Sequence, residues 1–121
     1  MPSQQQKRCF PRISLRVPIK YQVRGASEAD NTLCDNISER GLRIISQQYI
    51  PPATPVMLEI NLSSRVLHPV GRIAWSSPLP HSDRNRIGIE FLELGFEEKE
   101  YLNNFISSAI GSMRMNKYKG D

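Results

Sequence analysis

The chain has 121 residues, enough for one domain around one modest hydrophobic core. Its 16 lysines and arginines outnumber its 12 acidic residues, and the resulting net charge of +4 favours an anionic partner. No apolar run reaches the length of a membrane span, about 20 residues, and residues 1–7 lack the apolar centre of a signal peptide, so we expect a cytoplasmic protein without membrane insertion.

The first 24 residues carry an unusual charge pattern. Six cationic side chains and no acidic one fall here: Lys7, Arg8, Arg12, Arg16, Lys20 and Arg24. Residues 1–11 are polar with little to bury, which predicts a flexible N-terminal arm. Within it, Pro11 disfavours a helix around the pair Arg8 and Arg12. Because a guanidinium group donates pairs of hydrogen bonds to phosphates and stacks on flat rings, we interpret Arg8 and Arg12 as one half of an anion site.

Six segments read as short strands. Residues 14–24 give the clearest signal, because apolar and polar side chains alternate along them with a period of two. The further strands are predicted at residues 32–37, 42–46, 56–62, 65–75 and 86–93. Turn-length segments rich in Gly, Pro, Asn and Ser separate them, which favours antiparallel pairing.

The pattern changes after the last strand. Apolar residues between 97 and 113 follow the 3.6-residue period of an amphipathic helix, with three glutamates in its first turns. Six antiparallel strands bury their apolar faces best by closing into a small barrel, so we predict a mainly all-β barrel over residues 12–113. The helix would cap an open end or pack on an outer face, residues 114–121 would form a polar tail, and a β-sandwich is the alternative fold.

Asn36, Ser38 and Gly41 form the pattern N-x-S-x-x-G in a predicted turn between two strands. A carboxamide can bond a base edge, and a hydroxyl can hold a phosphate or ribose. A glycine can adopt a positive φ or let a backbone approach closely. The pattern is also compatible with an ordinary β-turn, so by itself it does not establish a site.

No catalytic or metal centre is apparent. Cys9 and Cys34 have no CxxC spacing, and we expect two free thiols. With His68 and His81 they match none of the usual zinc spacings. Neither histidine lies beside a nucleophile motif, so we predict a protein that is not an enzyme and holds no cofactor.

The order of these features resembles the PilZ domain, a bacterial receptor family for the second messenger cyclic di-GMP. The family's two signatures, RxxxR and [D/N]xSxxG, are both intact and occur in the expected order: Arg8 and Arg12, then Asn36, Ser38 and Gly41. The segments GRIAW at 71–75 and RIGIEF at 86–91 follow, and then the helix. The resemblance runs from about residue 7 to residue 113 and indicates a stand-alone, single-domain member.

The resemblance implies a six-stranded antiparallel barrel with a C-terminal helix, and it implies roles for the motif residues. Arg8 and Arg12 would clasp phosphates and stack on, or donate to, a guanine, which agrees with the donor geometry of arginine. Asn36 would bond a guanine edge. Ser38 and Gly41 would hold the backbone close to the ligand.

Two further positions bear on the ligand. Trp75 matches a family position where an aromatic ring can flank a base, although a tryptophan in the barrel core explains it equally well. Lys7 stands where many members have an arginine before RxxxR. A basic residue there goes with binding of two stacked ligand molecules, so we expect a stacked pair.

The resulting hypothesis is a cyclic di-GMP receptor whose arm changes conformation on binding and signals to an unidentified protein partner. Two alternatives remain open. One is a PilZ-like interaction module that binds no nucleotide, and the other is a small basic barrel that binds single-stranded nucleic acid.

Overall fold

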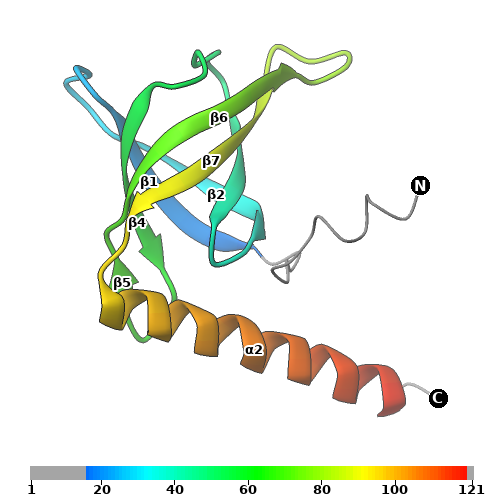
Figure 1. The fold of residues 1–121 in the computed structure, drawn as a ribbon. Helices are drawn as coiled ribbons and strands as arrows, with labels where there is room; N and C mark the ends of the chain where they lie inside the picture. Colours follow the sequence, from blue (N-terminus) through cyan, green and yellow to red (C-terminus); the bar gives the residue numbers. More distant parts are fainter. Residues whose placement is uncertain (1–15, 120–121) are drawn as a thin grey trace, which may run out of the picture.

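The computed structural model describes the backbone of residues 16–119 and the side chains of residues 16–111. Figure 1 shows strands wrapped into a barrel, with one helix lying across an end of it. The elements are β1 (Val17–Val23), β2 (Asp30–Ile37), β3 (Gly41–Ser46), β4 (Pro55–Asn61), β5 (Val66–Leu67), β6 (Val70–Pro78), β7 (Asn85–Glu93) and α2 (Phe96–Lys119).

The barrel is closed by pairing between β1 and β4. Neighbouring strands follow the order β1-β2-β3-β7-β6-β4, and β1 then pairs with β4 through contacts such as Ile19 opposite Ile60. All of these pairs are antiparallel. The predicted six-stranded antiparallel barrel is therefore confirmed, and the β-sandwich alternative is wrong.

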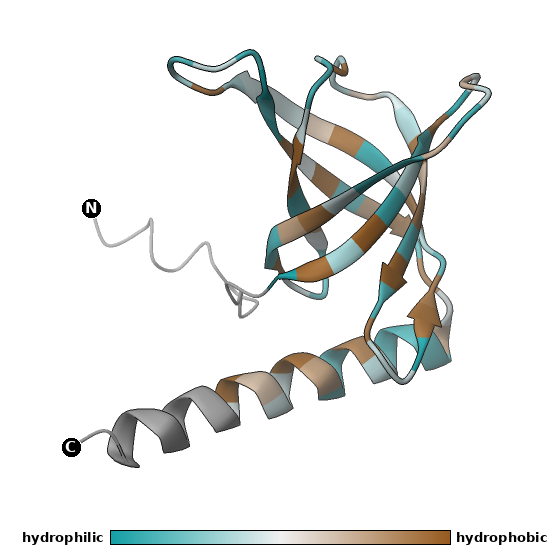
Figure 2. Cartoon of the chain, turned by 180° about the vertical axis from the view of Figure 1, so that it is seen from behind, coloured by the Kyte–Doolittle hydropathy of each residue, from teal (hydrophilic) through white to brown (hydrophobic). Residues whose placement is uncertain are grey.

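The interior is built from the alternation seen in the sequence. On β1, Val17, Ile19 and Tyr21 are buried, whereas Pro18 and Lys20 between them are exposed. Figure 2 shows apolar and polar positions alternating in the same way along the strands. Burial of these apolar faces is the main force that stabilises the barrel.

The predicted strand at residues 65–75 is divided in two. The two-residue strand β5 pairs with the end of β4, and β6 begins only at Val70. Between them lies the fully buried Pro69, which has no N–H group to donate to a strand ladder. A second irregularity falls between Ile73 and Trp75, where the register of β6 against β7 shifts.

Helix α2 covers the end of the barrel next to β5 (Figures 1 and 2). Leu102 and Ile106 are buried within the same core cluster as the strands, as the helical periodicity predicted. Of the two predicted placements, capping an open end is the observed one. The helix continues beyond residue 113 to Lys119.

Candidate functional site

The N-x-S-x-x-G segment forms the turn between β2 and β3. The Ser38 N–H donates to the carbonyl oxygen of Gly41 at 2.9 Å. The Ser38 hydroxyl oxygen accepts the Arg40 N–H at 3.2 Å, and its side chain is buried. Ser38 therefore lies inside the turn and fixes its shape.

Gly41 allows this turn to pack closely against β7. It lies opposite Glu90, and the neighbouring Phe91 N–H donates to the carbonyl oxygen of Arg40 at 2.9 Å. A Cβ at position 41 would clash with the carbonyl oxygen of Ile89. The φ angle of Gly41 is not positive, so of the two properties of glycine considered from the sequence, a positive φ is not the one used here. Close approach of two backbones is what requires glycine here.

The outer surface of three neighbouring strands carries the groups around this turn. Because residues in register on β3, β7 and β6 point to the same side, they form rows across the sheet. One row is Gly41, Glu90 and Arg72, and the next is Arg43, Gly88 and Trp75. Each row contains a glycine, and the missing side chains leave the surface hollow.

This hollow is an open pocket of about 520 Å³. Its walls are Asn36 and residues 40–43 on one side, Ala74 and Trp75 on β6, and residues 88–91 on β7. The structure thus brings together three residues predicted from the sequence: Asn36, Gly41 and Trp75. Ser38 is not among the lining residues, since it is buried in the turn beneath them.

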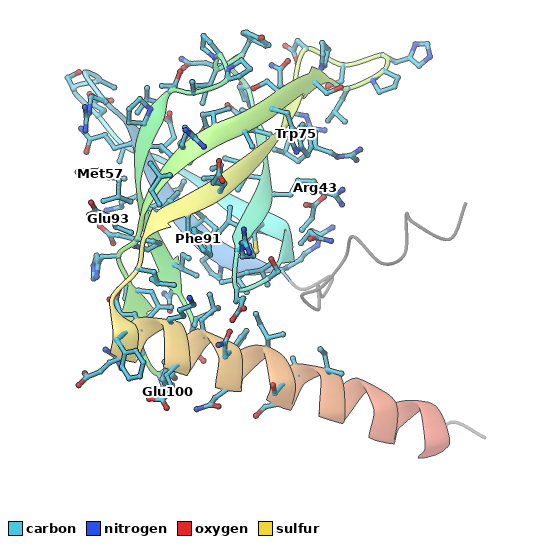
Figure 3. All side chains as sticks on the ribbon, in the orientation of Figure 1. Arg43, Met57, Trp75, Phe91, Glu93 and Glu100 are labelled. Atoms are coloured by element: carbon cyan, nitrogen blue, oxygen red, sulfur yellow. The ribbon has the colours of Figure 1, made fainter. Side chains whose placement is uncertain are left out.

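Trp75 lies on the outside of the barrel. Its side chain is 42% exposed, and its indole ring covers Gly88, where a Cβ would overlap the ring atoms. Figure 3 shows Trp75 and Arg43 projecting from the same side of the barrel. The alternative of a tryptophan in the barrel core is therefore wrong. An exposed aromatic ring on a flat glycine surface can stack on a planar ligand.

Charged side chains surround the pocket. Arg43 pairs with Asp35 through its Nε at 3.0 Å, at the point where the register of β2 against β3 shifts. Glu90 pairs with Arg72 at 2.7 Å. Three charged residues that line the pocket were not predicted from the sequence: Arg40, Arg43 and Glu90. Arg40 lies within the turn motif, and Arg43 follows Gly41 at the spacing that returns a strand to the same face, so the two arginines could have been found.

The other predicted ligand residues, Lys7, Arg8 and Arg12, lie outside the described residues. The register of β1 nevertheless fixes where the described chain begins. Val17 lies opposite Cys34, so the start of β1 is adjacent to the end of β2 that carries Asn36.

Cys34 is fully buried, and burial raises the pKa of its thiol. Because the thiolate is the reactive form, this cysteine is a poor nucleophile or metal ligand. Within the part of the chain that the structure describes, no three His, Cys, Asp or Glu side chains gather as a metal site would require. No described helix is long and apolar enough to cross a membrane.

The chain belongs to the PilZ domain family, whose sequence pattern it matches over residues 6–108. That range includes both signatures, Arg8 with Arg12 and the turn from Asn36 to Gly41. No match was found among curated proteins.

Solved structures share the fold at low sequence identity. The Bacillus subtilis inhibitor of motility, MotI/DgrA, has a TM-score of 0.78 at 18% identity over 88% of this chain and 52% of its own, so the present chain spans about half its length. The PilZ domain of Escherichia coli YcgR, solved with c-di-GMP, has a TM-score of 0.73 at 16% identity over 94% of this chain and 99% of its own. A K. pneumonia MrkH–c-di-GMP complex has a TM-score of 0.66 at 10% identity over 94% of this chain and 54% of its own.

Proposed function

We propose that this protein is a receptor for cyclic di-GMP, which binds in the pocket over β3, β7 and β6. The observation that carries the proposal is the meeting of the N-x-S-x-x-G turn with the exposed indole of Trp75 over Gly88. Membership of the PilZ family supports it, and two structures with the same fold were solved with c-di-GMP. The pocket volume of about 520 Å³ falls within the usual range for small-molecule sites, about 300–1,000 Å³.

The arginine pair is close enough in the chain to reach this pocket. Arg12 precedes Arg16 by four residues, and an extended chain of that length spans about 14 Å. Neighbouring strands are about 4.8 Å apart, and β1 begins beside the end of β2 that carries Asn36. The length of chain between Arg12 and β1 is therefore sufficient to reach the side of the pocket formed by Asn36.

Each proposed contact matches the chemistry of a cyclic guanine dinucleotide. Arg8 and Arg12 bind phosphate oxygens or the O6/N7 edge of a guanine. Asn36 bonds a base edge, and Trp75 stacks on a base. Lys7 adds a further cation, and we propose that two stacked ligand molecules bind together. Gly41 keeps the turn close to β7, and Ser38 holds its shape.

We propose further that ligand binding changes the conformation of the N-terminal arm, residues 1–11, and that the changed surface engages a protein partner in the cytoplasm. Only contacts that differ between the free and bound states can drive such a change, and contacts from Arg8 and Arg12 to the ligand are of this kind. NMR spectra of backbone amides with and without ligand test the idea. Unchanged signals around Arg8 on saturation would contradict it.

Calorimetric titration with cyclic di-GMP tests the receptor function directly. We expect binding with two ligands per chain, and a change in the fluorescence of Trp75, the single tryptophan. Arg8→Ala and Arg12→Ala should each weaken binding by a few kcal/mol, typical of charged hydrogen bonds, about 2–5 kcal/mol.

Arg24→Ala is the matched control, because it removes the same group from the opposite end of β1 and should leave affinity unchanged. Absence of binding would refute the receptor function, and binding of single-stranded oligonucleotides instead would favour a nucleic-acid role with steep salt dependence. The proposed role is binding without catalysis, so breakdown of cyclic di-GMP by the pure protein would also contradict it.

A further inference from the structure

Glu90 is unexpected in a pocket for a ligand with two phosphates. Among the described residues that line the pocket, it is the single carboxylate. A carboxylate repels phosphate groups, so its presence needs a compensating contact. In the strand register it lies between Gly41, which also lines the pocket, and Arg72.

The Glu90 carboxylate is held in place with one oxygen available. Arg72 donates to it from Nη2 at 2.7 Å and from Nε at 3.2 Å, and both bonds end on Oε1. Among the described residues, Oε2 accepts no hydrogen bond. The side chains of Arg72 and Glu90 are 46% and 45% exposed. A bound ligand can therefore reach a carboxylate oxygen whose direction is already fixed.

The position of Glu90 relative to Trp75 suits contact with the edge of a stacked base. Trp75 lies opposite Gly88, and Glu90 is two residues further along β7. Two residues of a strand span about 7 Å. A purine on the indole would thus have one edge within reach of the Glu90 side chain.

Guanine presents two adjacent donors on its Watson–Crick edge, the N1–H and the exocyclic amino group, and the two lone pairs of one carboxylate oxygen can accept both. Adenine has an unprotonated N1 at the same place, which a carboxylate repels. Arginine binds the O6/N7 edge of guanine on another side of the ring. A guanidinium and a carboxylate can therefore bind the same base.

We propose that Glu90 selects guanine, with its carboxylate accepting hydrogen bonds from the Watson–Crick edge of a base stacked on Trp75. Arg72 is a positioning residue that orients the carboxylate. This inference rests on the proposed function and adds to it the residue that distinguishes guanine from other purines.

The test compares two ligands that differ at one group. Cyclic di-IMP carries hypoxanthine, which keeps the N1–H and lacks the exocyclic amino group of guanine. We expect the wild type to prefer cyclic di-GMP to cyclic di-IMP by about tenfold or more, typical of a hydrogen bond to a charged group. Glu90→Gln should reduce this preference to less than threefold. Cyclic di-AMP should bind the wild type at least a hundredfold more weakly than cyclic di-GMP.

Glu59→Gln is the matched control, since Glu59 is an exposed glutamate on β4 that lies opposite Lys20 on β1 and is not among the residues that line the pocket. It should retain the full preference, and circular dichroism should show each variant folded. If Glu90→Gln lowers the affinities for cyclic di-GMP and cyclic di-IMP equally, so that their ratio is unchanged, the inference is wrong while the receptor function stands. If the wild type binds no cyclic dinucleotide, both fail.

Discussion

Two outer faces of the same barrel differ in a way that locates the site. The pocket face, over β3, β7 and β6, has a glycine in each of its two rows, at Gly41 and Gly88. On the opposite face, the strand register of β1 and β4 places Lys20 across from Glu59 and Gln22 across from Met57. Figure 3 shows Met57 on the side of the barrel away from Trp75.

The interiors behind both faces are alike, since both are lined by buried Ile, Leu and Val side chains. The face over β1 and β4 has two smaller hollows beside Met57, of about 180 and 230 Å³. The pocket of about 520 Å³ arises where side chains are missing. Gly41 allows the turn to approach β7 closely, and Gly88 leaves room for the Trp75 indole. The size of the pocket in this barrel therefore depends on small outward-facing residues more than on the fold itself.

Gly41→Ala should have the largest effect. Its new Cβ would meet the carbonyl of Ile89, which belongs to a paired strand and cannot move aside as a flexible side chain could. We expect a loss of about 2–4 kcal/mol in the free energy of unfolding, similar to other cases of overpacking and strain. Urea denaturation followed by circular dichroism measures it.

Gly111→Ala provides the control for this change. Position 111 lies in α2, and a Cβ there would meet no atom within 4 Å. Alanine should raise stability by up to about 1 kcal/mol because it favours helix. If the two variants were equally stable, the explanation of Gly41 by close backbone approach would have to be abandoned.

Gly88→Ala should act on binding more than on stability. The added methyl group would displace the Trp75 indole, which is exposed and free to move outward. We expect loss of a stacking contact, about 1–3 kcal/mol of binding free energy. Titration with cyclic di-GMP gives this loss, and the emission of the single tryptophan reports the displaced ring.

Met57→Ala tests the same comparison from the other face. Met57 is 60% exposed on β4 and lies outside the pocket. Its removal should leave the affinity for cyclic di-GMP unchanged. If Met57→Ala and Gly88→Ala lost affinity for cyclic di-GMP equally, the two faces would not differ in function.

The sequence predicted the barrel well because a period of two identifies half-buried strands without knowledge of their partners. It identified Asn36 and Gly41 as candidate site residues because both belong to one short turn motif. It left Trp75 undecided, since strict alternation from the buried Ile73 would put it inside the barrel. The register shift between these two residues turns the Trp75 side chain outward, and no feature of the sequence predicts this shift.

Glu90 was missed for a different reason. It meets Gly41 and Arg72 only through strand pairing, so residues far apart in the chain become neighbours. Periodicity shows that such a side chain points outward and does not show what lies beside it. The division of the strand at residues 65–75 was missed because Pro69, although unable to donate, is buried as an apolar residue should be.

Ser38→Ala should have an intermediate effect on stability. It removes the hydroxyl that accepts the Arg40 N–H inside the turn. We expect a loss of about 1–2 kcal/mol in urea denaturation, near the value of one buried hydrogen bond. Ser107→Ala, on the exposed side of α2, should change stability by less than about 0.5 kcal/mol. Equal stabilities for Ser38→Ala and the wild type would show that the hydroxyl does not hold the turn.

Tyr21→Phe should have the smallest effect at neutral pH, and it tests a link between the two faces. The Tyr21 hydroxyl on β1 donates to the Ser46 hydroxyl on β3 at 3.1 Å, so one hydrogen bond joins a strand of each face. Its loss should lower the free energy of unfolding at pH 7 by about 1 kcal/mol.

The effect of Tyr21→Phe should shrink at high pH. Burial raises the pKa of Tyr21 in the folded protein above its usual value of about 10, and the hydrogen bond between Tyr21 and Ser46 only partly opposes it. The unfolded chain therefore loses this proton first, and the stability that the neutral phenol contributes is present below pH 10 and lost as the pH rises through the folded pKa. Phenylalanine has no proton to lose, so the stability curves of the wild type and Tyr21→Phe should converge as the pH rises above 10. Urea midpoints at pH 7, 9 and 11 measure this, and curves that stay parallel would show that Tyr21 ionises as freely in the barrel as in the unfolded chain.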